Sequence, residues 1–254
     1  MKRLYTAVYT LLFCLALSSC SYKYYAPGLY QNDVQNMLKP HSKDTIKNRT
    51  YATGTLLTQG GAAGQGNSTS GLLNIYRAHT IRHFNFAYGA LGYAGSYQKD
   101  NYENQTLVNT THKSFLGYGF NGSTSYYVNG GNVDFRIIGV DLVYTHESGD
   151  FLAFRKSVAG QTNVLSATQA SMFSYSVFSE ANFKLDEDFN LGLKFFASRV
   201  TGNINQYLHN SNATVAGGTG YLSFKRFTIH STVALGGNNI TPNAALQMGL
   251  TYGF

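Results

Sequence analysis

Long and short links alternate along this chain between ten strand-like runs, and this alternation constrains the fold more than any other feature. Each run has the two-residue period of a β-strand. The runs cover residues 49–58, 70–78, 85–97, 113–128, 132–145, 170–184, 189–200, 213–224, 227–236 and 243–254. Long polar links follow the odd-numbered runs, and mostly short links follow the even-numbered ones. An up-and-down sheet gives this pattern when its two ends face different surroundings.

The composition favours a membrane protein built from strands. Charged residues make up only 12% of the chain, against roughly 25% in soluble domains. Lipid offers no hydrogen bonds to the backbone, so a sheet that crosses a bilayer must close on itself. We therefore predict an all-β fold, an up-and-down antiparallel transmembrane β-barrel of about ten strands. The alternative is an exported β-sandwich, but its exposed strand face should carry charges.

Apolar residues pair with apolar residues across the three short turns "DED", "KR" and "NGG". Centring "DED" on its middle residue pairs Phe183 with Leu191 on the outside and Glu180 with Lys194 on the inside. The other two turns give these outward pairs: Phe224 with Phe227, Leu222 with Ile229, Val128 with Val133, and Tyr126 with Phe135. After Ile137 the outward set shifts by one position, which predicts a β-bulge.

The first twenty residues, "MKRLYTAVYTLLFCLALSSC", have the features of a secretory signal. Their apolar stretch is shorter than the roughly 20 residues of a membrane-spanning helix. It ends in "LSSC", which resembles the lipobox of bacterial lipoproteins, where the cysteine carries the lipid. The resemblance implies a signal peptide over residues 1–19, lipidation of Cys20 and a periplasmic tether over residues 20–48. The barrel is expected over residues 49–254.

The last strand, "LQMGLTYGF", resembles the C-terminal signal strand that the barrel-insertion machinery reads in outer-membrane barrels. Its outward residues are Leu246, Met248, Leu250, Tyr252 and Phe254. With the lipobox and the alternating links, the chain is similar to lipid-anchored outer-membrane β-barrel proteins of Gram-negative bacteria. An even number of strands returns the chain to the side where it started. We therefore expect the lipid anchor and both chain ends on the periplasmic side.

The inward positions collect most of the charge in the predicted strands. A barrel of about ten strands has a narrow interior that side chains largely fill, and charges there must pair or meet water. The expected lumen network consists of Asp134, Arg136, Asp141, Glu180, Lys194, Tyr221 and His230. We expect Glu180 to face Lys194 directly and His230 to be a packed, hydrogen-bonded residue.

No motif in the chain points to catalysis or to a cofactor. There is no G-x-S-x-G elbow, and no Ser/His/acid set lies near one rim. His79, His83 and His112 lack the tight spacing of metal ligands, so no metal is expected. The basic residues are scattered, which argues against nucleic-acid binding.

The sequence thus predicts a non-enzymatic outer-membrane lipoprotein with a structural or accessory role in the envelope and a lumen largely closed by side chains. One alternative is a narrow pore or a ligand-binding barrel. A second alternative is an enzyme at the lumen rim that acts on lipid. The expected partners are outer-membrane lipid, the barrel-insertion machinery and a further protein of the envelope.

Overall fold

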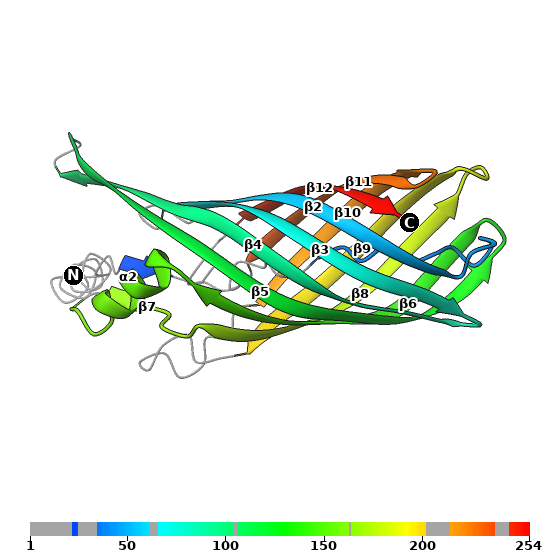
Figure 1. Cartoon of the computed structure of the whole chain (residues 1–254), viewed down its shortest axis with the longest axis horizontal. Helices are drawn as coiled ribbons and strands as arrows, with labels where there is room; N and C mark the ends of the chain where they lie inside the picture. Colours follow the sequence, from blue (N-terminus) through cyan, green and yellow to red (C-terminus); the bar gives the residue numbers. More distant parts are fainter. Residues whose placement is uncertain are drawn as a thin grey trace, which may run out of the picture.

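The computed structural model describes residues 22–24, 35–60, 66–103, 106–162, 164–201, 214–236 and 244–254. Ten antiparallel strands pair in chain order and close into a barrel where β12 meets β2 (Figure 1). They are β2 (Asn48–Gly60), β3 (Asn67–Ile81), β4 (Phe84–Glu103), β5 (Thr106–Gly130), β6 (Val133–Ser148), β8 (Ser171–Lys184), β9 (Phe189–Thr201), β10 (Thr214–Phe224), β11 (Phe227–Gly236) and β12 (Ala244–Gly253). The predicted closed, up-and-down all-β barrel is confirmed, and the β-sandwich alternative is wrong.

The two rims of the barrel differ in their links. One rim, here the turn rim, holds the short links at residues 82–83, 131–132, 185–188 and 225–226. The other, the loop rim, holds the remaining links. The first residue of each two-residue turn has a positive φ, 50° at Arg82, 75° at Gly131 and 54° at Lys225. This conformation matches the twist of the flanking strands, so these turns hold their hairpins tightly.

Two of the three predicted hairpin registers are confirmed. Glu180 pairs with Lys194 across β8 and β9, and the β10–β11 hairpin pairs as its sequence predicted. The register predicted for "NGG" is wrong by two residues, because Val128 pairs with Phe135 rather than with Val133. The observed register puts Gly131 first in the turn, where a positive φ strains glycine least. A shift of two leaves every side chain on its predicted face.

The bulge predicted after Ile137 is present in β6. The register of β6 with β8 shifts between Arg136 and Gly139, and the register with β5 shifts between Tyr126 and Tyr127. Ile137 and Ile138 consequently both face outward, with exposed fractions of 48% and 55%.

The link predicted over residues 98–112 is mostly strand. Strands β4 and β5 continue to Glu103 and Thr106, with an irregularity at Asn101 and Tyr102. Beyond Gln98, β4 pairs only with β5, and this hairpin projects past the loop rim (Figure 1). These strands could not be predicted because the stretch "QKDNYENQTLVNTT" has no sustained alternation of apolar and polar residues.

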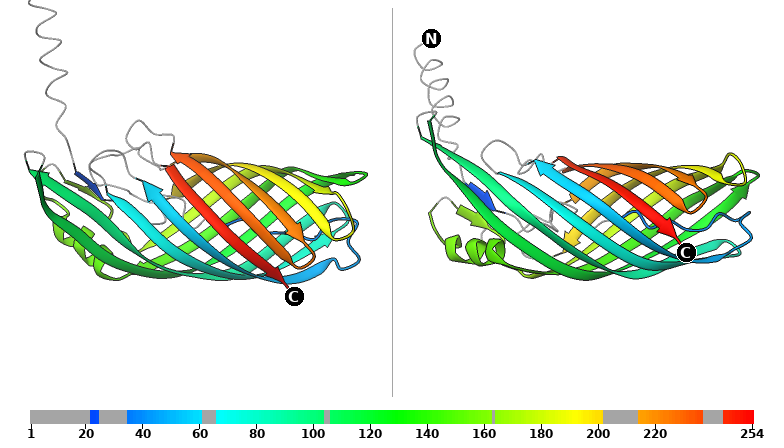
Figure 2. Two further views of the ribbon diagram at one scale, coloured as in Figure 1. Left: turned by 90° about the horizontal axis from the view of Figure 1, so that it is seen from above. Right: turned by 45° about the horizontal axis from the view of Figure 1, so that its top comes forward.

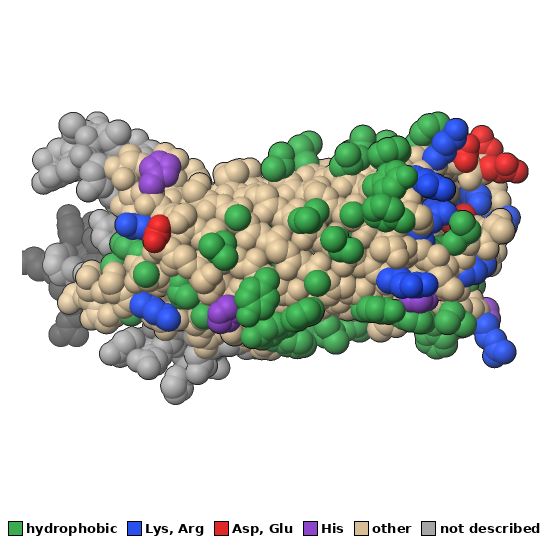
Figure 3. Space-filling model, viewed as in Figure 1, with side chains coloured by type: hydrophobic (Ala, Val, Ile, Leu, Met, Phe, Trp, Pro, Cys, Tyr) green, Lys and Arg blue, Asp and Glu red, His purple; other side chains and the backbone are tan. Residues whose placement is uncertain are grey.

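The outer wall of the barrel is apolar and the inner wall is mainly polar. Along most strands, buried and exposed residues alternate. Hydrophobic side chains are spread over the wall, while most of the Lys, Arg, Asp and Glu side chains in this view lie at the turn rim (Figure 3). Exposed residues of the wall include Leu56, Leu73, Ile75, Phe120, Ile138, Phe195, Ile229, Met248 and Leu250. An apolar surface of this extent is typical of a barrel that faces lipid.

A cap that the sequence did not predict lies at the loop rim. It consists of helix α2 (Asp150–Val158), strand β7 (Val164–Ser166) and strand β1 (Tyr22–Tyr24), which pairs with β7 in parallel (Figure 2). Arg155 of α2 is buried, and it donates hydrogen bonds to Glu147 Oε1 at 2.6 Å and to the Ala167 carbonyl at 2.7 Å. No helix in the described ranges is both long and apolar enough to cross a bilayer.

Residues 35–47, here the lumen segment, run from the barrel interior to the turn rim and lead directly into β2. Residues 35–41 are all buried. The sequence predicted a periplasmic tether over residues 20–48, and this described part of it packs against the barrel wall. Moreover, β1 lies at the loop rim while β12 ends at the turn rim, so the described N-terminal residues and the C-terminus are at opposite rims (Figures 1 and 2). The sequence had placed both chain ends at the same rim.

Candidate functional site

The bulge in β6 creates the charged centre of the lumen. Arg136 and Asp141 are five residues apart, so a regular strand would point them to opposite faces. Ile137 and Ile138 both face outward at the bulge, which adds one residue to the stretch between the two charged residues. Both charged side chains therefore face inward. They are 0% and 3% exposed.

Arg136 is the most connected residue of this centre. Its Nη1 forms an ion pair with Glu180 Oε1, and its Nε donates to Asn85 Oδ1 at 3.0 Å. Its Nη2 donates to the carbonyl of Lys39 in the lumen segment at 3.3 Å. Tyr221 donates its hydroxyl to the same Glu180 oxygen at 2.6 Å. Arg136 thus joins the barrel wall to the segment inside it.

A second ion pair lies beside the first. Lys194 Nζ is 2.7 Å from Asp141 Oδ2, which also accepts a hydrogen bond from Ser176 at 3.1 Å. Glu180 and Lys194 are register partners as predicted, but their ion-pair partners are Arg136 and Asp141 respectively. The sequence of the β8–β9 hairpin does not reveal these ion pairs, because both use residues of β6.

The ammonium of Lys39 also enters this centre, from the lumen segment. Lys39 Nζ lies 4.9 Å from the centroid of the Phe178 ring, and Lys194 Nζ lies 4.1 Å from the same centroid. Lys39 is 4% exposed, and its Nζ has no hydrogen-bond acceptor among the described residues. Two carboxylates therefore face three cations in a region with little access to water.

The lumen segment is tied to the wall along its whole length. Its residues make hydrogen bonds with Thr55, Tyr76, Arg136, Thr80, Asp134, Asn132 and Lys184 of the wall and turn rim. Asp134, predicted to be part of the lumen network, accepts hydrogen bonds from the backbone and hydroxyl of Ser42. Asp44 forms an ion pair with Lys184 at 2.9 Å. These contacts indicate a fixed occupant of the lumen.

Tyr221 and His230 are register partners on the inner wall, but they do not form a hydrogen-bonded pair. The Tyr221 hydroxyl binds Glu180, and neither ring nitrogen of His230 has a hydrogen-bond partner among the described residues. The imidazole packs against Gly249, where a Cβ would approach it to 2.2 Å. His230 is thus buried, with no hydrogen bond to its ring among the described residues.

An apolar cluster that the sequence did not predict lies in the lumen below the cap. Phe151 of α2 stacks on Tyr97 with ring centroids 4.3 Å apart. Both belong to a buried cluster whose other members are Leu57, Leu72, Leu91, Tyr93, Phe115 and Val143. The lumen is therefore occupied by apolar side chains near the loop rim and by the lumen segment toward the turn rim.

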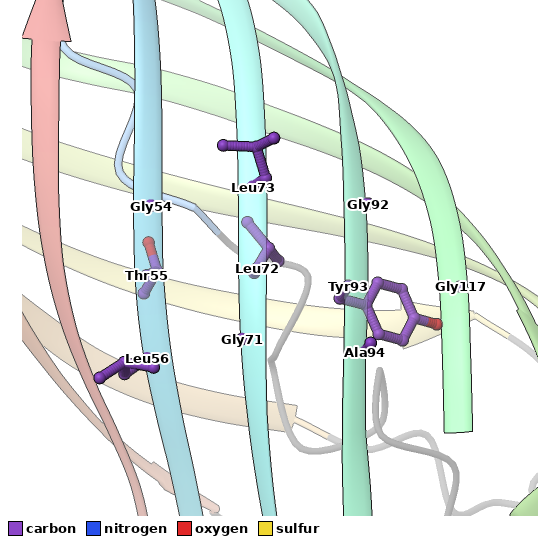
Figure 4. Close-up of a pocket in the computed structure, with 10 residues that line it drawn as sticks. All are labelled: Gly54, Thr55, Leu56, Gly71, Leu72, Leu73, Gly92, Tyr93, Ala94 and Gly117. Carbon is purple, nitrogen blue, oxygen red and sulfur yellow. The ribbon is translucent and has the colours of Figure 1, made fainter. Parts of the chain in front are cut away.

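A shallow hollow on the outer wall has no reactive side chain. Small residues Gly54, Gly71, Gly92 and Ala94 form its floor, with Leu56 and Leu73 beside them (Figure 4). A Cβ on Gly54 or Gly71 would meet nothing within 4 Å. The hollow is thus part of the apolar outer surface.

The remaining predicted residues lie at the surface or outside the described ranges. Leu246, Met248, Leu250 and Phe254 are exposed on the outer wall, and Tyr252 packs between Phe227 and Phe254 with ring centroids 5.0 Å from each. Cys20 and residues 1–19 lie outside the described residues. His79 stacks on Phe86 near the turn rim. In the part of the chain that the structure describes, no three His, Cys, Asp or Glu side chains gather into a metal site.

No protein-family model and no curated protein matches the chain. Solved structures give matches at low identity. Neisserial surface protein A is 12% identical, with a TM-score of 0.37, and covers 82% of this chain and 97% of its own. The beta domain of the Bordetella autotransporter Brka is 9% identical, with a TM-score of 0.46, and covers 82% and 99%. The transport unit of the autotransporter AIDA-I from Escherichia coli is 13% identical, with a TM-score of 0.40, and covers 89% and 96%. At such scores these likenesses assign no activity to this chain.

Proposed function

We propose that this chain is a lipid-anchored outer-membrane barrel that neither conducts solutes nor catalyses a reaction, and that it serves a structural or accessory role in the envelope. The observation that carries the proposal is the occupied lumen. In the turn-rim half of the interior, the lumen segment forms hydrogen bonds with Arg136 and Asp134 of the wall. A buried apolar cluster lies in the loop-rim half, beside the Arg155–Glu147 ion pair.

The apolar outer wall supports the membrane location, because its exposed side chains cover a closed barrel on the side where a soluble protein would carry charge. In outer-membrane barrels the short turns lie on the periplasmic side and the longer loops on the outside. The turn rim and the C-terminal Phe254 are accordingly assigned to the periplasmic side. The lipid anchor is assigned to Cys20 on the strength of "LSSC".

Conductance across planar bilayers tests whether the lumen is closed. We expect the wild-type barrel to insert without producing current steps, and a variant that lacks residues 35–44 to produce them, because the deletion removes the contacts with Thr80 and Asp134. The Gly71→Ala variant, altered only on the outer wall, is the matched control and should stay silent.

Heat-modifiable mobility on gels would verify that each variant is folded. Ion-selective steps from the wild type would contradict a closed barrel and favour the narrow pore. A folded but silent deletion variant would show that the lumen segment is not what closes the barrel.

A further inference from the structure

The described residues before β2 start at one rim of the barrel and end at the other. Tyr24 of β1 packs at the loop rim, with its ring centroid 6.1 Å from that of Tyr97 and 5.1 Å from that of Phe154 in α2. Its carbonyl accepts a hydrogen bond from the Ala167 amide at 2.9 Å. Asn48, where β2 begins, pairs with His79 next to the turn rim.

Between these points the wall contacts of the lumen segment move steadily toward the turn rim. Gln35 accepts a hydrogen bond from Thr55, near the middle of β2, at 3.4 Å. The Leu38 amide reaches the Tyr76 hydroxyl at 2.8 Å, and the Pro40 carbonyl reaches Thr80 at 2.8 Å. The next residues of the segment contact Asp134, Asn132 and Lys184 at the turn rim. The lumen segment therefore runs from the middle of the barrel to the turn rim.

We propose that the mature chain begins on the loop side of the barrel and passes through the lumen, so that Cys20 and its lipid lie at the cell surface. This proposal rests on the lipidation and orientation given under "Proposed function". Cys20 precedes Tyr22 by two residues, so it is at most about 7 Å farther along an extended chain. Because β1 is held at the loop rim, a lipid on Cys20 enters the leaflet on that side.

The pairing of β1 with β7 gives the N-terminal end a fixed position. Residues 22–24 pair in register with residues 164–166. Lys99 Nζ lies 5.1 Å from the centroid of the Tyr24 ring and 3.4 Å from its hydroxyl. The barrel thus acts as a conduit for its own N-terminus, in place of the periplasmic tether that the sequence predicted.

Labelling of single-cysteine variants shows on which side of the membrane each substituted position lies. The chain has only Cys14, in the predicted signal peptide, and Cys20, whose thiol a lipid would block. We would compare Lys23→Cys in β1 with Ser157→Cys in α2 and with Lys225→Cys at the turn rim, using a membrane-impermeant maleimide on intact cells. The expected result is labelling at positions 23 and 157, with labelling at position 225 only after the outer membrane is opened.

The pattern separates the proposals. If the cysteines at positions 23 and 157 are labelled under the same condition, either on intact cells or only after the outer membrane is opened, the result supports passage through the lumen. If both of these cysteines are protected on intact cells and the cysteine at position 225 is labelled, the assigned orientation is wrong but the passage through the lumen is supported. Position 23 reacting together with position 225 would overturn the passage. Maleimide labelling of Cys20 in the wild type would contradict lipidation alone.

A cross-link tests the position of β1 without relying on accessibility. Lys23 and Leu165 are register partners in the β1–β7 pair, and neighbouring strands bring Cα atoms within the roughly 4.4–6.8 Å that a disulfide needs. The Lys23→Cys/Leu165→Cys variant should form an intramolecular disulfide, seen as a mobility shift that a reductant reverses. The pair Lys23→Cys/Lys225→Cys is the matched control and should not form one. The reverse result would overturn the proposal.

Discussion

At the scale of single residues, the bulge in β6 decides which side chains meet inside the barrel. It turns Arg136 and Asp141 to the same face, and each then finds its own partner, Glu180 and Lys194. A buried ion pair contributes little net stability, but removing one member leaves an uncompensated charge. The centre therefore makes the barrel sensitive to single substitutions and more tolerant of matched double ones.

Glu180→Gln should destabilise the barrel by about 3–5 kcal/mol, the usual cost of breaking a buried pair. Adding Arg136→Met should recover part of that loss, because the orphaned charge is then gone. Unfolding in urea, followed by gel mobility, measures both effects. Arg155→Met in the cap is a suitable second-site control, since it shares no partner with Glu180 and its effect should add. A loss for the double variant equal to the sum of the losses for Glu180→Gln and Arg136→Met alone would show that Arg136 and Glu180 do not depend on each other.

Lys39→Met should stabilise the folded barrel by something on the order of 1 kcal/mol, because methionine fills similar space without a charge to desolvate. The ammonium of Lys39 has no hydrogen-bond acceptor among the described residues. Lys43→Met is the control, because Lys43 is exposed and bonded to Asn132 at 2.8 Å. A lower urea midpoint for Lys39→Met than for the wild type would show that the two nearby carboxylates more than offset the desolvation.

At the scale of the strands, glycines on the inner and outer faces have different roles. Gly192 of β9 lies beneath the Tyr221 ring, and a Cβ there would lie 1.8 Å from the ring. Gly71 of β3 faces outward over open space. The inner glycine therefore makes room for the aromatic side chain that binds Glu180, while the outer one is not required by packing.

Gly192→Ala should cost about 1–3 kcal/mol through overpacking, because Tyr221 must move away from Glu180. Gly71→Ala should be neutral or stabilise by up to about 1 kcal/mol, since alanine loses less chain entropy in a strand. Urea midpoints of the two variants give the comparison. Similar midpoints would mean that Tyr221 relaxes without cost or that Gly71 contacts something outside the described residues.

The strands and their faces could be predicted from the sequence, because a period of two survives small errors in register. The "NGG" turn illustrates this point: a two-residue error misplaced Val128 yet kept every face. The lumen segment and α2 could not be predicted, because neither sequence has a sustained hydrophobic period. The ion-pair partner of Glu180 could not be predicted because no short turn joins β6 to β8 and sets the register that pairs it with Arg136. The partner of Lys194 could not be predicted because Asp141 and Lys194 lie on β6 and β9, with β8 between them.

At the scale of the whole molecule, cations gather at the turn rim (Figure 3). Arg82, Lys225 and Arg226 lie in its short turns and are exposed. An anionic bilayer attracts such residues by about 1 kcal/mol each, and salt weakens the attraction.

The barrel should therefore resist urea better in vesicles that contain anionic phospholipid than in zwitterionic ones. The variant Arg82→Gln/Lys225→Gln/Arg226→Gln should lose this preference, while Lys156→Gln in α2 should keep it. Raising the salt concentration should reduce the difference between the two vesicle types. A preference that survives the triple substitution would have to arise elsewhere on the molecule.

The position of the lumen segment restricts the order in which the barrel can be assembled. The segment leads directly into β2, and β2 forms the closing seam with β12, the last strand of the chain. A narrow barrel that has already sealed would have to admit a segment carrying bulky side chains and, if Cys20 is lipidated, an acyl group at its far end. Assembly is simpler if the strands wrap around the segment while the seam is open. The final step of folding is then the pairing of β12 with β2, which closes the barrel around the lumen segment.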